Sequence, residues 1–157
     1  MKKALISVLV PFLLVAFGAL GYHYWDTGAL PGMQPTFHPV SVAEINAENR
    51  GVRVRGTAHY PIRLHQTFEG GERWLVFPLL PPGDTLGREI KLMVRTQHVP
   101  DELVTYEDLE IDGLARPAGS RIGPRLIDAL KAQGYTFADK VIIVEAMDVR
   151  GKSHEAD

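Results

Sequence analysis

The stretch Val52-Arg53-Val54-Arg55-Gly56-Thr57-Ala58 alternates apolar with polar side chains. Because successive side chains of a β-strand point to opposite faces, this pattern predicts a strand with Val52, Val54 and Ala58 inward and both arginines outward. The stretch therefore predicts a sheet with one buried face and one solvent-exposed face.

Four further segments have strand character: residues 74–80, 90–95, 109–114 and 140–149. Turns rich in glycine and proline separate them, as at 69–71 and 81–84. Five short strands with such turns predict a mainly β fold, a small closed or partly closed five-stranded barrel like that of the oligonucleotide/oligosaccharide-binding (OB) type. Gly56 and Gly113 each interrupt a strand pattern, and we expect bulges there that bend the sheet toward closure.

A short helix is predicted at residues 124–133, which begin with Pro124, carry one apolar stripe and precede Gly134. Proline favours the first turn of a helix and glycine its end. This helix falls between the fourth and fifth strands, so we expect an insertion that caps one end of the barrel. A helical turn or two is also expected at 101–106.

The N-terminal residues 1–25 predict a membrane-spanning helix. An uncharged, mostly apolar run at 4–20 follows Lys2 and Lys3 and ends in the aromatic cluster 22–25. Its length approaches the roughly 20 residues that span a bilayer, and the aromatic residues suit the headgroup zone. A cleaved signal peptide is the alternative, because small residues near the end of the run suit signal peptidase.

The position of the lysines predicts the orientation. By the positive-inside rule, the N-terminus stays in the cytoplasm and the rest of the chain lies outside. In a bacterium this predicts a single-pass inner-membrane protein with a periplasmic domain. Residues 26–39, rich in proline and glycine, are predicted to be an extended tether, 40–149 the barrel domain and 150–157 a polar tail.

Composition limits the function classes. The 157 residues include 17 basic and 19 acidic side chains, a net charge of −2, which does not favour a nucleic-acid partner. The chain has no cysteine, so the domain holds together by packing without disulfides. It also lacks thiol chemistry, and Ser120 does not lie in a Gly-x-Ser-x-Gly elbow. We therefore expect no catalytic residues and no enzyme activity.

The order of these parts also suggests a family. The matching segments are Phe37-His38-Pro39-Val40-Ser41, Val52-Arg53-Val54-Arg55-Gly56, Val99-Pro100-Asp101-Glu102-Leu103, Glu110-Ile111-Asp112-Gly113 and Phe137-Ala138-Asp139-Lys140-Val141. With its basic start, span, tether and predicted barrel, the chain resembles the CcmE family of membrane-tethered haem chaperones of cytochrome c maturation. The resemblance implies an OB barrel that works at the membrane.

The chain departs from that family at the last strand. The family has a lysine-histidine-acid signature there whose histidine carries haem, whereas this chain has Val144-Glu145-Ala146-Met147-Asp148 and no following tyrosine. The departure excludes covalent haem capture by the family's route, and non-covalent haem binding stays open. Met147 could ligate iron, but a strand methionine more often fills the core.

Five residues are predicted to form a ligand or partner surface: Arg53, Arg55, Tyr60, Arg63 and Trp74. Arginines with nearby aromatic rings on an OB face can grip single-stranded nucleic acid or sugar. Contact with a partner protein or lipid headgroups, or pairing with acidic residues across the strands, explains the same arginines without such a ligand.

Asp108, Glu110 and Asp112 recur with a period of two, which places them on one face of a strand. Their proximity could raise a pKa or hold calcium, but a solvated face is the favoured interpretation. The histidines lack the spacing of a metal site, so we expect them to be surface or hydrogen-bonding residues, with His59 and His65 facing each other across a hairpin. No metal is expected.

The hypothesis from the sequence is a membrane-anchored, non-catalytic periplasmic module that docks on a membrane protein complex or helps to assemble one. The alternative is a CcmE-like protein that binds haem or another small ligand non-covalently. Apart from haem, no cofactor is expected.

Overall fold

The computed structural model describes residues 13–24, 29–31, 33–48, 50–62, 64–67, 73–97 and 104–151. The chain divides into two compact units, residues 1–36 and 37–157. The second unit begins at Phe37, slightly before the domain start expected at residue 40. Its last described residue is Gly151, so residues 152–157 of the expected tail lie outside the described residues.

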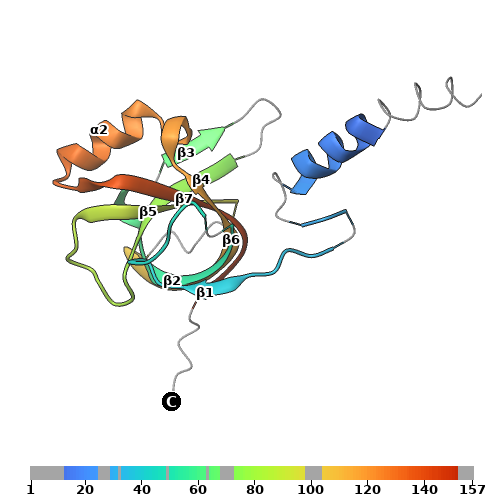
Figure 1. Cartoon of the computed structure of the whole chain (residues 1–157). Helices are drawn as coiled ribbons and strands as arrows, with labels where there is room; N and C mark the ends of the chain where they lie inside the picture. The colour runs from blue at the N-terminus through green and yellow to red at the C-terminus, as the bar shows by residue number, and fades with distance from the viewer. Residues whose placement is uncertain are drawn as a thin grey trace, which may run out of the picture. The chain divides into compact units, whose positions relative to one another are not determined.

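The first unit contains a helix over residues 13–24, drawn in blue in Figure 1. Several of its apolar side chains are exposed, among them Leu14, Val15 and Phe17. Among the described residues, no helix has the length and apolar character needed to cross a membrane. The first part of the expected span, residues 1–12, lies outside the described residues.

The second unit is built around one seven-stranded sheet. Its elements in chain order are β1 (His38–Val40), β2 (Gly51–His59), η1 (Tyr60–Ile62), β3 (Leu64–Thr67), β4 (Arg73–Leu80), β5 (Glu89–Thr96), β6 (Tyr106–Pro117), η2 (Gly119–Arg121), α2 (Pro124–Ala132) and β7 (Thr136–Gly151). The mainly β prediction is confirmed. All five predicted strands are present, as β2, β4, β5, β6 and β7, and the predicted helix is α2.

The strand pairing closes on itself. The order is β1-β2-β6-β7-β5-β4-β3, and β2 also pairs with β4, so β2, β6, β7, β5 and β4 form a hydrogen-bonded ring (Figure 1). Within the ring β5 and β7 run parallel, and the other neighbours run antiparallel. The short strands β1 and β3, which the sequence did not predict, lie outside the ring.

Two hydrophobic cores stabilise the unit. The larger fills the ring and includes Val54, Phe77, Leu92, Ile111 and Val144. The smaller lies between the outer face of the sheet and α2 and includes Val76, Met93, Leu126, Leu130 and Ile143. Strands β4, β5 and β7 contribute side chains to both cores, which explains why residues 74–80 are apolar without alternation.

The helix α2 has the ends that the sequence predicted. Pro124 occupies its first turn, and Leu126 and Leu130 form its buried face. At its C-terminus, Gly134 has φ +84° and the Tyr135 amide donates to the Leu130 carbonyl. Such a left-handed glycine with a returning backbone bond is a common helix stop.

Gly56 and Gly113 allow close approach between strands. A Cβ on Gly56 would meet the Leu80 carbonyl, just before β2 pairs with β4 while it stays paired with β6, and a Cβ on Gly113 would meet the Glu145 carbonyl. The register between β6 and β7 shifts beside Gly113, so Met147 is the extra residue of a bulge. The bulge expected at Gly113 is therefore present, on the facing strand β7. At Gly56 the register with β6 is unbroken, so the bulge expected there is absent, and the glycine instead allows the Leu80 carbonyl to pack closely.

Candidate interaction site

A ladder of opposite charges crosses the outer face of β2 and β6. Arg53 lies directly opposite Asp112, and Arg55 lies opposite Glu110. Arg53 donates from Nε and Nη2 to the two carboxylate oxygens of Asp112, both at 2.7 Å. Arg55 donates from Nε to Glu110. The interpretation that the arginines pair with the acidic row is confirmed at both positions.

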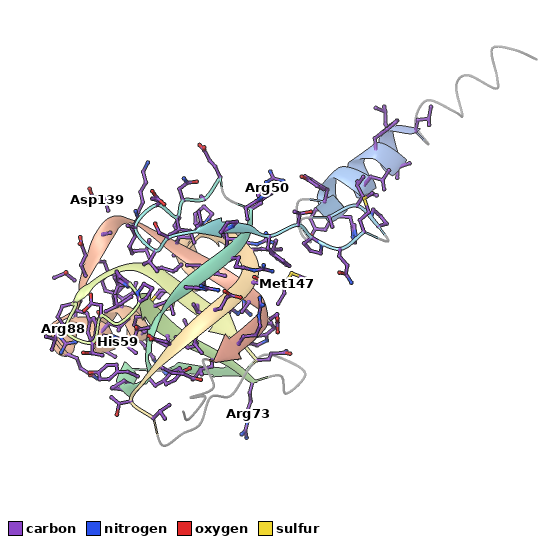
Figure 2. All side chains as sticks on the ribbon, turned by 90° about the horizontal axis from the view of Figure 1, so that it is seen from below. Arg50, His59, Arg73, Arg88, Asp139 and Met147 are labelled. Carbon is purple, nitrogen blue, oxygen red and sulfur yellow. The ribbon has the colours of Figure 1, made fainter. Side chains whose placement is uncertain are left out.

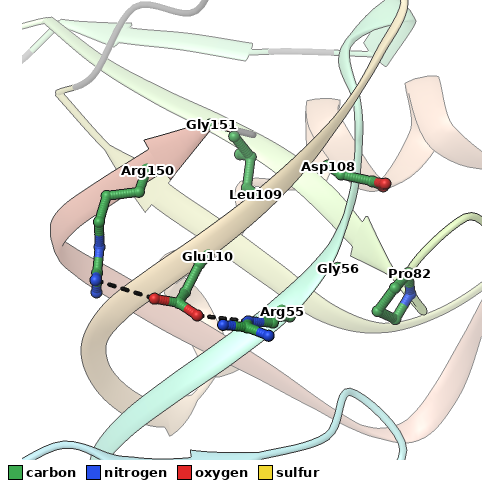
Figure 3. Close-up of a pocket in the computed structure, with 8 residues that line it drawn as sticks. All are labelled: Arg55, Gly56, Pro82, Asp108, Leu109, Glu110, Arg150 and Gly151. Atoms are coloured by element: carbon green, nitrogen blue, oxygen red, sulfur yellow. Dashed lines mark hydrogen bonds and ion pairs between the residues drawn. The ribbon is translucent and has the colours of Figure 1, made fainter. Parts of the chain in front are cut away.

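Arg150 extends the ladder onto β7. Its guanidinium contacts Asp112 at 2.7 Å, Glu110 at 3.0 Å and Asp148 at 3.1 Å. One cation therefore contacts three carboxylates from two strands. Figure 3 shows Glu110 between Arg150 and Arg55.

Asp112 is buried beneath these contacts. The favoured interpretation of the acidic row, a solvated face, is therefore wrong at Asp112. The hydrogen bonds from Arg53 lower the pKa of Asp112, with the charge of Arg150 as a further cause and burial opposing them. The same hydrogen bond with Asp112 raises the pKa of Arg53. At Asp112 the raised pKa considered as an alternative is thus wrong, because two cations stabilise the ionised carboxylate.

Thr57 continues the row toward the β4–β5 loop. Its buried hydroxyl donates to Asp108 and accepts a hydrogen bond of 2.7 Å from the Gly83 amide. The polar face of β2 and β6 is therefore tied to the loop that carries Pro82.

Two hollows adjoin on this face. One has a volume of about 500 Å³ and is lined by Arg55, Gly56, Pro82, Asp108, Leu109, Glu110, Arg150 and Gly151 (Figure 3). The other, of about 510 Å³, is lined by Pro39, Val40, Ser41, Val42, Glu44, Arg53, Arg55, Pro82 and Glu110. Three residues, Arg55, Pro82 and Glu110, belong to both. We call the two hollows together the Arg55 groove.

Backbone forms much of the floor of the first hollow. Leu109 lies between Gly56 on β2 and Gly151 on β7. The Leu109 side chain packs in the inner core, and the glycines have none, so this row adds no side chain to the outer face. The row on one side carries Arg55 and Glu110, and the row on the other side carries Asp108. These side chains form the walls of the first hollow.

Arg55 is the most available charge in the groove. Its side chain is 77% exposed, and its Nε contact with Glu110 leaves both terminal amino groups directed to solvent among the described residues. A guanidinium presents its two amino groups in a plane that matches a carboxylate. The groove is therefore suited to hold an acidic group of a binding partner, with its orientation fixed by Glu110.

The predicted surface residues do not form one site. Arg53 and Arg55 line the groove. Tyr60 is 2% exposed, packs edge-on against Phe77 and donates to Glu107, so its placement on a binding surface is wrong. Its ring lies in the larger core, and its hydroxyl donates to Glu107. The sequence pattern does not predict this arrangement. Arg63 lies outside the described residues.

Trp74 belongs to a second cluster, on β4 and β5. The Arg95 guanidinium lies 4.6 Å from the centre of the Trp74 ring. Arg95, together with Arg116 and Arg121, also surrounds Glu145 at 3.0–3.6 Å. This cluster could not be predicted from the sequence, because its members are scattered through the chain and meet through the pairing of β4 to β7 and the position of η2.

The structure tests two further expectations. His59 is completely buried and forms hydrogen bonds to the Tyr135 hydroxyl and to the Asp84 carbonyl, each at 2.9 Å, so of the two expected roles, surface or hydrogen-bonding, the second is confirmed. Met147 is 56% exposed rather than part of the core, because it alternates with Val144 and Ala146, which face the larger core. The side chain of His65 lies outside the described residues.

Within the described part of the chain, no group of three or more histidine, cysteine or acidic residues is placed to hold a metal ion. The groove brings together guanidinium and carboxylate groups that neutralise each other. Comparison with protein-family models, with curated proteins and with solved structures finds no match for this chain.

Proposed function

We propose that this chain is a membrane-anchored periplasmic interaction module of the OB-like type, without catalytic activity. It docks on a membrane protein complex or assists its assembly. The observation that carries the proposal is the Arg55 groove, two adjoining hollows around an arginine that pairs with Glu110 and still has a side chain 77% exposed.

The strand arrangement supports the OB-like part of the proposal. In an OB barrel five strands close, the third and fifth pair in parallel, and the first pairs with the second and fourth. The ring follows that order, with β2, β4, β5, β6 and β7 as strands one to five. The short strands β1 and β3 and the inserted α2 are additions to it.

The N-terminal segment supports the membrane part. Lys2 and Lys3 precede the apolar run, and the helix over residues 13–24 exposes leucine, valine and phenylalanine side chains. Such side chains gain free energy on transfer from water into lipid. A tether of this kind raises the local concentration of the domain near membrane partners.

The experiment compares wild type with R55E and a matched charge reversal on α2, R125E, after crosslinking of the full-length chain in cells. We expect the same partner to co-purify with wild type and R125E, and its recovery to fall roughly tenfold or more with R55E. Equal recovery with all three chains contradicts docking through the groove. Recovery of the full-length chain from the soluble interior of the cell contradicts the membrane anchor.

Non-covalent haem binding is the second candidate, and the exposed Met147 is the observation that favours it. A thioether that faces solvent on a bulge is accessible as an axial ligand for haem iron. A Soret-region titration of the full-length chain with haem tests this. Saturable binding at micromolar haem that M147A weakens would replace the docking proposal, and its absence would exclude the haem candidate.

A further inference from the structure

The loop between β4 and β5, residues 81–88, is held in one conformation by many hydrogen bonds. The Asp84 carboxylate accepts from the amides of Leu86 and Gly87, at 3.1 and 2.6 Å. The Asp84 amide donates to the Pro81 carbonyl. These contacts close the loop on itself in the manner of an Asx turn.

The loop is also tied to the domain beneath it. Gly83 donates to Thr57, and buried His59 bonds to the Asp84 carbonyl. Since a carbonyl can only accept, His59 donates from Nε2, and its Nδ1 accepts from the Tyr135 hydroxyl in the neutral tautomer. The loop is thus attached to β2 and, through Tyr135, to the segment that follows α2.

At its tip this loop exposes an apolar side chain. Leu86 is 84% exposed, the largest exposed fraction among the large apolar side chains described. A single exposed leucine is ordinary on a protein surface. A leucine on a loop with this many internal bonds differs, because the loop is already ordered and binding loses less conformational entropy.

Arg88 adds a charge two residues further along. Its guanidinium lies 4.9 Å from the centre of the Tyr135 ring and donates to the Tyr135 hydroxyl at 3.2 Å. Figure 2 shows Arg88 beside His59. In the described part of the chain, Arg88 forms no ion pair, so its position is fixed while its charge is not neutralised by a carboxylate.

We propose that the 81–88 loop is a docking element for a partner protein. Leu86 packs against apolar side chains of a segment of that partner, and Arg88 pairs with an acidic side chain of the same segment. The inference rests on the proposed function, because Pro82 of this loop lines both hollows and joins the loop to the Arg55 groove. The partner segment thus carries apolar side chains together with acidic ones.

A protein fits the loop better than a lipid surface does. The loop and the residue after it carry Asp84 and Glu89, with Glu89 exposed, and they contain no aromatic residue. Loops that insert into headgroups are typically rich in basic and aromatic residues. The mixed charge around Leu86 matches the polar rim of a protein interface.

The test uses the full-length chain, immobilised in detergent, to select 12-residue peptides from a random displayed library. We expect enriched peptides to combine acidic with apolar residues. Their affinity should fall about tenfold with L86D and with R88E. T85A, in the same loop and also exposed, is the matched control and should leave the affinity unchanged. Equal thermal unfolding of the four chains excludes a folding defect.

A further variant tests the role of loop order. D84A removes the acceptor of two loop amides and leaves Leu86 in place, so we expect roughly threefold weaker binding. Unchanged affinity with both L86D and R88E overturns the inference.

The outcomes separate the loop from the groove. Binding that depends on Arg55 but not on Leu86 or Arg88 overturns the loop inference and leaves the proposed function standing. Binding that depends on Leu86 and Arg88 but not on Arg55 supports the loop and contradicts the groove. A selection that enriches no peptide counts against both.

Discussion

Asp112 on β6 lies directly opposite Asp148 on β7, and Arg150 contacts both carboxylates, at 2.7 and 3.1 Å. Like charges placed opposite each other on neighbouring strands repel. The guanidinium of Arg150 offsets this repulsion and also reaches Glu110. Arg150 thus stabilises the pairing of β6 with β7 beyond the bulge.

R150Q should therefore destabilise the domain by about 0.5–1.5 kcal/mol, a range set by the partial exposure of the network. Urea denaturation of wild type and R150Q measures the free energy of unfolding. Adding D148N to R150Q should recover part of the loss, since one of the two facing carboxylates is then neutral. R125Q on α2 is the control. A loss no larger in R150Q than in R125Q contradicts this role of Arg150.

The pKa of Asp112 predicts a dependence of stability on pH. Because Arg53 and Arg150 hold this pKa below the unfolded value of about 3.9, the ionised carboxylate stabilises the fold above that pH. The contribution is lost as the pH falls through the folded-state pKa. D112N should cost about 1–2 kcal/mol at pH 7.

The difference in unfolding free energy between wild type and D112N should shrink below about pH 4. In that range the Asp112 carboxylate of wild type is protonated first in the unfolded chain and, at lower pH, in the folded domain. Denaturation curves collected between pH 7 and pH 2.5 measure it. A difference that stays constant over this range would show that the carboxylate charge does not contribute.

Buried His59 predicts a large effect at a site away from the groove. H59F leaves the Asp84 carbonyl and the Tyr135 hydroxyl without their described ring partner, which should cost about 2–4 kcal/mol. Y135F removes the hydroxyl and keeps the ring, and should cost about 1–2 kcal/mol.

Since the two side chains bond to each other, the double variant should lose less than the sum of the two single losses. A thermodynamic double-mutant cycle by chemical denaturation measures this coupling. Strict additivity would mean that the Nδ1 contact adds no stability.

Two glycines predict steric effects. G56A and G113A each introduce a Cβ at 2.4 Å from a carbonyl oxygen on a neighbouring strand, so each should destabilise by about 1–3 kcal/mol. G18A, where an added Cβ meets no described atom within 4 Å, should leave the unfolding of the domain unchanged. Thermal unfolding followed by near-ultraviolet circular dichroism distinguishes them, and a neutral G56A or G113A would contradict close packing at that position.

Local pattern predicted the elements that local chemistry determines. Residues 52–58 alternate, and Val52 and Val54 are buried while Arg53 and Arg55 are exposed. Pro124 and Gly134 mark the ends of α2 because their backbone preferences act within a few residues. The charge pairs of the ladder follow from opposite charges at a period of two on β2 and β6, once the two strands are adjacent.

The remaining features depend on contacts between distant segments. The three-residue strand β1 is too short to carry a period. His59 bonds to Tyr135, 76 positions along the chain, and no local signal indicates that contact. Tyr60 has both an apolar ring and a polar hydroxyl, so its pattern suits a surface or a core. Met147 is apolar and therefore suited the core, but on β7 it alternates with the inward Val144 and Ala146 and so faces solvent.

The contact between β2 and β4 comprises only the pairs Thr57–Leu80 and Ala58–Leu79, whereas β2 meets β6 over nine pairs. Two residue pairs therefore close the hydrogen-bonded ring of strands. Local opening of the fold should start at this short β2–β4 pairing. The amide protons of Leu79 and Leu80 on β4 should therefore exchange with deuterium before those of β6. Because the chain has no cysteine, no disulfide holds the ring of strands closed, and hydrophobic packing and strand pairing do so instead.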